Sequence, residues 1–96
     1  MHRDLIEVAA LLLSELVTNA IRHGKGAVRL VVKKLPSRLC VEVTDDGPGL
    51  PAARAPRNDH AGGRGLMLVE RLANDWGVTP LANGSGKTVW FTLRTA

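Results

Sequence analysis

Aromatic residues are scarce in this 96-residue chain, which has no tyrosine, one phenylalanine and two tryptophans. Proteins that bind single-stranded nucleic acid stack bases on aromatic side chains set among basic residues. The net charge of +4 and the pI near 10 would otherwise favour such binding. Because no basic cluster is interleaved with the few aromatics, we predict that the chain does not bind nucleic acid directly.

Cysteine and long apolar runs are also lacking. The single cysteine, Cys40, excludes an internal disulfide and a cysteine cluster for zinc, and it suits a reducing cytoplasm. The longest apolar run, Val8 to Leu13, is too short to cross a membrane, and there is no signal-peptide pattern. With 45% hydrophobic residues, the composition fits one small domain over residues 1–96. We therefore predict a cytoplasmic, single-domain protein that binds no membrane.

The first half of the chain predicts a long helix followed by a hairpin. Asp4 can cap a helix whose apolar residues recur at helical spacing, and Gly24 is its expected left-handed stop. The strand-like segments 28–33 and 39–44 are joined through residues 36–37, Pro-Ser, which indicates a hairpin.

The second half predicts a loop, a helix and two closing strands. Residues 50–62 have the composition of a mobile loop, placed where a lid would be useful. Helical spacing returns over 66–73, and the segments 76–82 and 88–94 are strand-like around a turn. This order of elements predicts an α+β fold with the helices on one face of a mixed or antiparallel sheet.

The first helix carries a polar stripe of an acid, an amide and two nitrogen bases. Glu15 and Asn19 are four residues apart, and Arg22 and His23 extend the stripe by a turn. An amide oxygen at Asn19 can complete the shell of a magnesium ion that also binds phosphate oxygens. Glu15 would then polarise a hydroxyl or water that attacks the terminal phosphate. The alternative is an ordinary solvated helix face.

An acidic residue continues the apolar row of the segment 39–44. Period-two alternation places Asp45 on the same face as the apolar residues before it, where an acid is unexpected without a partner. A carboxylate there can accept a hydrogen bond from the amine of adenine, while Gly47 and Gly49 let the backbone pass close to the base. A plain acidic turn would explain the glycines and leave Asp45 unexplained.

A glycine cluster precedes the predicted second helix. The free amides of Gly63, Arg64 and Gly65 and the positive end of the helix dipole are suited to hold phosphate, and the Arg64 guanidinium adds charge. The alternative is a flexible hinge. The run 84–88, Gly-Ser-Gly-Lys-Thr, mimics the end of a P-loop, but Leu81 stands where the first glycine is needed and a strand follows. We therefore place no phosphate site there.

Four segments in this order resemble the GHKL superfamily of ATP-binding domains, most closely its anti-sigma-factor serine kinase branch, over nearly the whole chain. The segments look like the N box (Glu15 to Asn19) and the first (Asp45-x-Gly47-x-Gly49), second (Gly63-x-Gly65-Leu66) and third (Gly86-Lys87-Thr88) glycine boxes.

The resemblance implies a two-layer α/β sandwich, the Bergerat fold, with a mixed sheet and with ATP held between the helices beneath a lid. It implies that Asn19 binds Mg²⁺, that Asp45 reads adenine and that Glu15 is the general base, with Leu66 and Thr88 also at the nucleotide. The implied activity is phosphorylation of a serine or threonine on an antagonist protein by a kinase that sequesters a sigma factor, in transcription regulation.

Two other functions remain open: a nucleotide-responsive binding module without catalysis, and a detached histidine-kinase catalytic domain. Histidine kinases usually have asparagine in place of Glu15 and carry a separate phosphoacceptor helix that this chain lacks. The stretches 76–78 and 86–90 look like short ATP-binding regulators of actinobacteria.

The sequence departs from the superfamily in two places. Relatives have a strand and a helix ahead of the N box, and without them we expect an unpaired sheet edge. Lys87 stands where relatives have threonine, and alternation places Lys87 on the face of Val89 while Thr88 faces away. The sequence does not choose between Arg22 and His23 as the nucleotide contact, nor does it decide whether the chain forms a homodimer.

Overall fold

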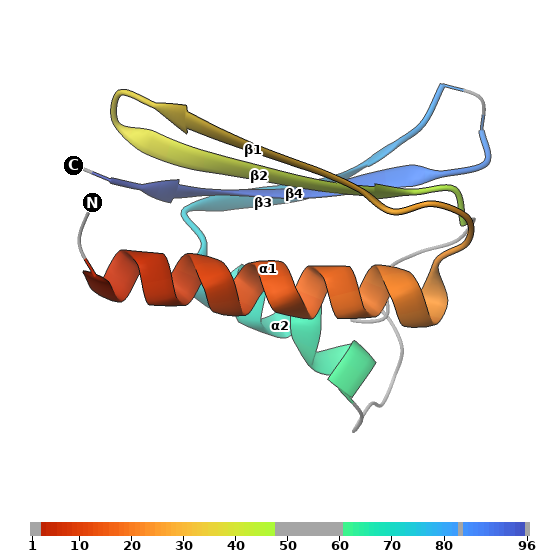
Figure 1. The fold of residues 1–96 in the computed structure, drawn as a ribbon, viewed down its shortest axis with the longest axis horizontal. Helices are drawn as coiled ribbons and strands as arrows, with labels where there is room; N and C mark the ends of the chain where they lie inside the picture. Colours follow the sequence, from red (N-terminus) through yellow and green to blue (C-terminus); the bar gives the residue numbers. More distant parts are fainter. Residues whose placement is uncertain (1–2, 48–60, 83, 96) are drawn as a thin grey trace.

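A computed structural model describes residues 3–47, 61–82 and 84–95, which form two helices and four strands (Figure 1). In chain order these are α1 (Arg3–His23), β1 (Arg29–Leu35), β2 (Arg38–Asp45), α2 (Ala61–Leu72), β3 (Asp75–Pro80) and β4 (Lys87–Arg94). The predicted hairpin through residues 36–37 is confirmed, because Leu35 pairs with Arg38. None of the described helices is long and apolar enough to cross a membrane.

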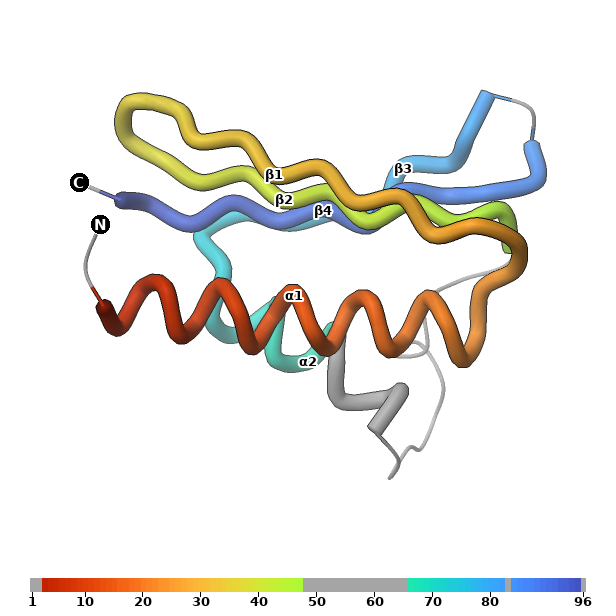
Figure 2. Tube along the Cα trace, viewed as in Figure 1, coloured from red at the N-terminus to blue at the C-terminus, as the bar shows by residue number. Residues whose placement is uncertain are grey.

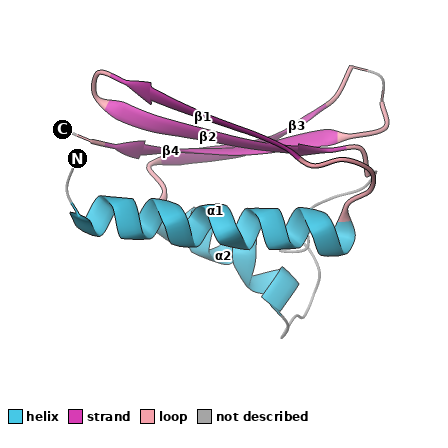
Figure 3. Ribbon diagram, in the orientation of Figure 1, coloured by secondary structure: helices cyan, strands magenta, loops and turns pink. Residues whose placement is uncertain are grey.

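The strands form one sheet in the order β1-β2-β4-β3, with both helices on the same face (Figures 1 and 3). This confirms the predicted α+β fold with helices on one face. Every pairing between the described strands is antiparallel, so the sheet they form is antiparallel and not mixed. Short hairpin connections, β1 to β2 and β3 to β4, account for two of the three pairings.

The core lies between α1, α2 and the inner faces of the two central strands. On α1, Leu12, Leu16 and Ala20 recur every four residues and are buried, as helical spacing predicts. β2 alternates strictly between buried and partly exposed side chains from Leu39 to Asp45, so one face of this strand packs on the helices. Leu66 and Val69 of α2 complete the layer.

The end of α1 corrects one prediction. The Gly24 amide donates to the Ala20 carbonyl at 2.8 Å, but the left-handed residue of this turn is Gly26, with φ of 74°, and not Gly24. The Asp46 amide then donates to the Lys25 carbonyl at 2.8 Å, which ties the end of β2 to the end of α1. This connection places Asn19 and His23 of the polar stripe of α1 beside Asp45.

The second helix starts earlier than predicted. α2 begins at Ala61 and not near Leu66, so Gly63, Arg64 and Gly65 lie within the helix and not before it. Glycine disfavours a helix by only about 1 kcal/mol per residue, which surrounding structure can override. Most of the segment predicted to be a lid, 50–62, lies outside the described residues, as does Gly49.

Candidate nucleotide-binding site

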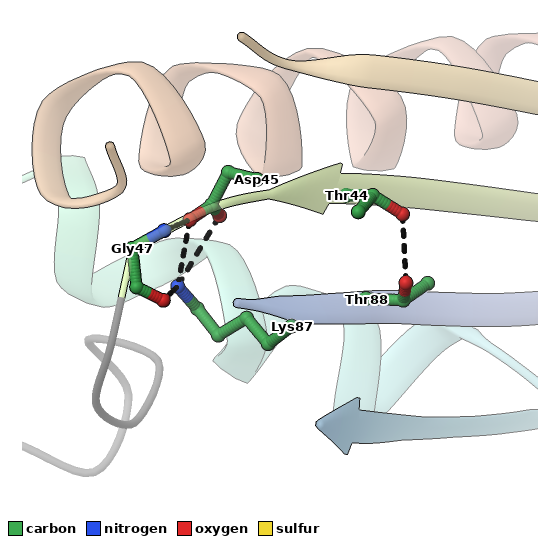
Figure 4. Close-up of polar contacts among 5 residues, drawn as sticks. All are labelled: Thr44, Asp45, Gly47, Lys87 and Thr88. Atoms are coloured by element: carbon green, nitrogen blue, oxygen red, sulfur yellow. Dashed lines mark hydrogen bonds and ion pairs between the residues drawn. The ribbon is translucent and has the colours of Figure 1, made fainter. Parts of the chain in front are cut away.

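The last residue of β2 and the first residue of β4 face each other on the helix-covered side of the sheet. Asp45 pairs directly with Lys87 in the strand register, and their side chains lie together in Figure 4. Asp45 is only 2% exposed and Lys87 8%. Both charges are therefore buried, which is tolerated when each has partners.

The Asp45 carboxylate receives three hydrogen bonds. The Lys87 ammonium lies 3.1 Å from Oδ1 and 3.2 Å from Oδ2, and the Gly47 amide donates to Oδ1 at 2.6 Å (Figure 4). Lys87 Nζ also donates to the Gly47 carbonyl at 3.4 Å. A carboxylate has about four acceptor positions, so this one retains capacity for a further donor.

Glycines enclose Asp45 so closely that no larger residue fits. A Cβ on Gly24 would lie 2.5 Å from Asp45 Cγ, and one on Gly47 would lie 2.9 Å from Asp45 Oδ1. A Cβ on Gly86 would come within 2.6 Å of the Asp45 carbonyl oxygen. Gly24 is thus needed for the close approach of backbone to this carboxylate and Gly86 for the close approach of β4 to the backbone of Asp45, and φ at both is one that any residue can adopt.

Asn19 of α1 is 6% exposed, and its Oδ1 has no hydrogen-bond partner within the described part of the chain. Most buried amide oxygens are hydrogen-bonded, so this one is available to a bound group such as a metal ion or a water molecule. Asn19 lines a cavity together with His23, Asp45 and Lys87. The cavity has a free volume of about 10 Å³, roughly that of one water molecule. A nucleotide base therefore enters only if a side chain moves.

The other candidate site residues on the two helices differ in whether they line this cavity. Glu15 is half-buried one turn before Asn19 and does not line the cavity. Arg22 and His23 are both exposed, and of the two only His23 lines the cavity. Leu66 is buried in the hydrophobic core at 2% exposure.

Thr88 lies on the face of the sheet opposite the helices, where its hydroxyl is 2.7 Å from that of Thr44 (Figure 4). Thr88 does not line the cavity with Asn19 and Asp45. Gly63 and Arg64 belong to the first turn of α2 and Gly65 follows them. The first four amides of any helix lack partners within the helix, so the backbone here can still serve a phosphate.

The donors fit Mg²⁺ bound through phosphate. No group of three His, Cys, Asp or Glu side chains within residues 3–47, 61–82 and 84–95 is arranged to hold a metal ion. Mg²⁺ takes few protein ligands and keeps waters and phosphate oxygens instead, so a single buried amide oxygen at Asn19 suffices.

No role at the site was predicted for Lys87 from the sequence. Two features of the sequence could have indicated its role. Strand alternation places Lys87 on the inner face of the sheet, and Asp45, an acid at the end of a buried row, needs a partner. The strand register joins the two, because it sets Asp45 opposite Lys87.

Comparisons with known proteins identify the domain. Residues 1–93 match the histidine kinase-like ATPase domain family. The signal transduction histidine-protein kinase AfsQ2 of Streptomyces coelicolor is 27% identical over 85 residues, which is 88% of this chain and 14% of that protein.

Solved structures agree with this assignment. The blue-light activated histidine kinase of Erythrobacter litoralis EL346 is 31% identical with a TM-score of 0.68, over 92% of this chain and 30% of the kinase. The histidine kinase AdeS of Acinetobacter baumannii is 16% identical with a TM-score of 0.64, over 93% of this chain and 46% of that one, and this likeness concerns the fold alone. The resemblance to the GHKL superfamily is thereby confirmed, and the chain belongs to the histidine kinase-like ATPase domain family.

Proposed function

We propose that this chain binds ATP with Mg²⁺ and is the nucleotide-binding part of a histidine-kinase-type signalling system. The observation that carries the proposal is the cavity that joins two buried groups, the Asn19 oxygen, which has no hydrogen-bond partner among the described residues, and the Asp45 carboxylate. One group suits a magnesium ion and the other suits the amine of adenine.

Each end of the nucleotide has a matching group. Asp45 accepts a hydrogen bond from the adenine amine, and Gly47, where a Cβ would lie 2.9 Å from Asp45 Oδ1, keeps this carboxylate clear of a neighbouring side chain. Asn19 holds Mg²⁺, which when bound neutralises charge on the phosphates. The amides at the start of α2 and the His23 ring supply further donors for the phosphates.

We predict that Asn19→Ala weakens ATP binding about tenfold when Mg²⁺ is present, the loss expected for one metal ligand. Titration calorimetry with ATP in Mg²⁺ and then in EDTA measures this. In EDTA the variant and the wild type should bind alike. Ser14→Ala, an exposed change on the same helix, is the matched control. An equal loss in both buffers would contradict the assignment of Asn19 to the metal.

Glu15 supports a second function, the serine or threonine kinase of an anti-sigma-factor antagonist. A hydroxyl acceptor must lose its proton as its oxygen bonds to the γ-phosphorus, the bond from that phosphorus to the β-γ bridging oxygen breaks and ADP leaves. A carboxylate one turn from Asn19 can take this proton. A histidine acceptor attacks through a nitrogen lone pair and has less need of such a base. The relatives found are histidine kinases, so we rank the hydroxyl acceptor second.

We predict that Glu15→Gln lowers ATP hydrolysis, with water as the acceptor, by about 100-fold and changes ATP affinity less than about twofold. Steady-state phosphate release and calorimetry measure the two effects. Glu7→Gln, on the exposed face of the same helix, should change neither. Equal hydrolysis by wild type and Glu15→Gln would remove the base role. ATP binding with no hydrolysis by the wild type would favour a nucleotide-responsive binding module, with sigma factor or antagonist as its partner.

A further inference from the structure

A second cavity lies at the far end of the paired strands β2 and β4 from the nucleotide site. The pairing of these strands has Asp45 opposite Lys87 at one end and Arg38 opposite Arg94 at the other. Seven residue steps separate the two pairs, which is about 24 Å along a strand. Figure 2 shows the turn between β1 and β2 and the end of β4 together at the arginine end of the sheet.

This cavity, which we name the outer cavity, has a free volume of about 160 Å³. The described residues that line it are all polar or charged: Ser37, Arg38, Asn74, Asp75, Thr92 and Arg94. A cavity of about 150 Å³ holds benzene, so the outer cavity has room for roughly six to eight non-hydrogen atoms. Polar groups that lose water need hydrogen-bonding partners in its place. The outer cavity therefore suits a small polar ligand.

The outer cavity is on the face of the sheet that the two helices leave open. On β2 the buried side chains alternate from Leu39 to Asp45, so Arg38 belongs to the opposite face. Arg94 pairs with Arg38 and shares this face. Thr92 lies two residues before Arg94 on the same face, and Asp75 of β3 pairs with Thr92.

The two arginines form a like-charge pair without a counterion. Like charges directly opposite each other destabilise paired antiparallel strands. Arg38 and Arg94 nevertheless face each other in the register. Within the described residues neither guanidinium forms an ion pair, although Asp75 lines the same cavity. The outer cavity therefore presents two positive charges and one negative charge that do not neutralise one another.

Neutral hydrogen-bonding groups complete the wall. Thr92 is only 9% exposed, and its hydroxyl makes no hydrogen bond to another described residue. A hydroxyl both donates and accepts, so it can serve either an anion or a cation. The Asn74 Oδ1 accepts from the Arg94 amide at 2.6 Å. This bond holds the Asn74 side chain at the cavity and leaves its NH₂ group as a donor.

We propose that the outer cavity binds a free α-amino acid with a small polar side chain, such as serine. The carboxylate of the amino acid would lie between the guanidinium groups of Arg38 and Arg94, whose paired N–H groups match a carboxylate. Its ammonium would bind the Asp75 carboxylate. The Thr92 hydroxyl and the Asn74 amide would then receive the remaining polar groups of the ligand.

A zwitterion fits these charges better than a ligand of one sign. Inorganic phosphate would gain the two guanidinium groups but would be repelled by the unpaired carboxylate of Asp75. A simple amine would gain Asp75 and be repelled by both arginines. An amino acid carries both charges a few bonds apart, so each charge has a partner of opposite sign on the wall.

The proposal does not rest on the proposed nucleotide function. None of the residues lining the outer cavity lines the cavity of Asn19, which lies on the helix side of the sheet. Amino-acid binding can therefore be measured without nucleotide, and its outcome does not depend on whether ATP binds.

The test is a titration of L-serine into the ¹⁵N-labelled 96-residue chain, followed by the amide signals in NMR. We expect saturable shifts at Ser37, Asp75 and Thr92 and none at Asn19. Because the charged side chains of the outer cavity are exposed and screened by water, we expect a Kd of about 1 mM.

Two substitutions separate the positive from the negative part of the site. Arg94→Gln should weaken L-serine binding about tenfold. Asp75→Asn should weaken L-serine binding about fivefold but strengthen the binding of acetate, because it removes the charge that repels a lone carboxylate. Both residues are exposed, so the variants are expected to fold. Arg71→Gln, an exposed change on α2, is the matched control and should alter L-serine affinity less than about twofold.

Four outcomes would overturn the proposal. The first is the absence of saturable shifts in folded protein at about 100 mM L-serine. The second is binding of acetate or ethylammonium as tight as that of L-serine, because the site would then not read both charges. The third is tighter binding of inorganic phosphate that displaces L-serine from the same amides, which would show a simple anion site. The fourth is an equal loss in Arg94→Gln and Arg71→Gln, which would show that only net charge matters.

Discussion

Asp45→Asn is expected to weaken ATP binding by more than about 100-fold and to lower the free energy of unfolding by about 3–5 kcal/mol. Both effects have one cause. The carboxylate is the acceptor for the adenine amine in the proposed site, and in the same place it is the partner of the buried Lys87 ammonium, 3.1 Å from Oδ1. Without a negative charge at residue 45, Lys87 is left as an unpaired buried cation.

Calorimetric titration of ATP with Mg²⁺ and thermal or urea unfolding measure the two effects separately. Asp46→Asn is the matched control, because Asp46 is the next residue and is exposed. The double variant Asp45→Asn/Lys87→Met removes both charges and should regain most of the stability without regaining ATP binding. ATP binding by either Asp45 variant at wild-type affinity would contradict the role of Asp45 in reading the base.

Much of the fold could be predicted because its signals are local. The spacing of Leu12, Leu16 and Ala20 predicts the buried face of α1, and period-two alternation predicts the buried face of β2. The same alternation brings Asp45 onto the inner face, so the position of the candidate adenine contact follows from the sequence alone. Hairpin signals at residues 36–37 set the β1-β2 register.

Other features depend on contacts between distant segments, and the sequence did not reveal them. The left-handed residue, Gly26, lies against the Asp46 side chain, whereas Gly24 is required for another reason, because a Cβ there would strike the Asp45 side chain. The start of α2 at Ala61 could not be read from a run of glycines that weakens every local helix signal. The exposure of β1 requires knowing that it is an edge strand.

The Asp45-Lys87 pair gives the site two roles that oppose each other. Lys87 occupies two acceptor positions of the Asp45 carboxylate, and the cavity beside it has a free volume of about 10 Å³, so an adenine amine would have to share the carboxylate with the ammonium or displace it. The pair therefore stabilises the domain without nucleotide and competes with nucleotide for the same carboxylate. Such competition lowers affinity by the free energy needed to displace the ammonium.

Lys87→Met should consequently change stability and affinity in opposite directions. We expect unfolding to become easier by about 3–5 kcal/mol, because Asp45 loses its buried cation. We expect ATP with Mg²⁺ to bind about tenfold more tightly, because the carboxylate is free to accept the adenine amine and no ammonium has to be displaced. Lys34→Met, an exposed lysine on β1, should alter neither quantity.

Urea unfolding measures the stability of Lys87→Met, and calorimetric titration of the same preparation measures its affinity for ATP. The titration is made at a temperature where the unfolding data show the variant to be folded. Weaker ATP binding by folded Lys87→Met would show that the ammonium contacts the nucleotide and does not compete with it. Unchanged stability would show that Asp45 is held by Gly47 alone, whose amide donates to Oδ1 at 2.6 Å. If the Asp45-Lys87 ion pair competes with ATP, Lys87→Met must lower stability and raise ATP affinity. If Lys87 only supports the fold, the same substitution would lower both.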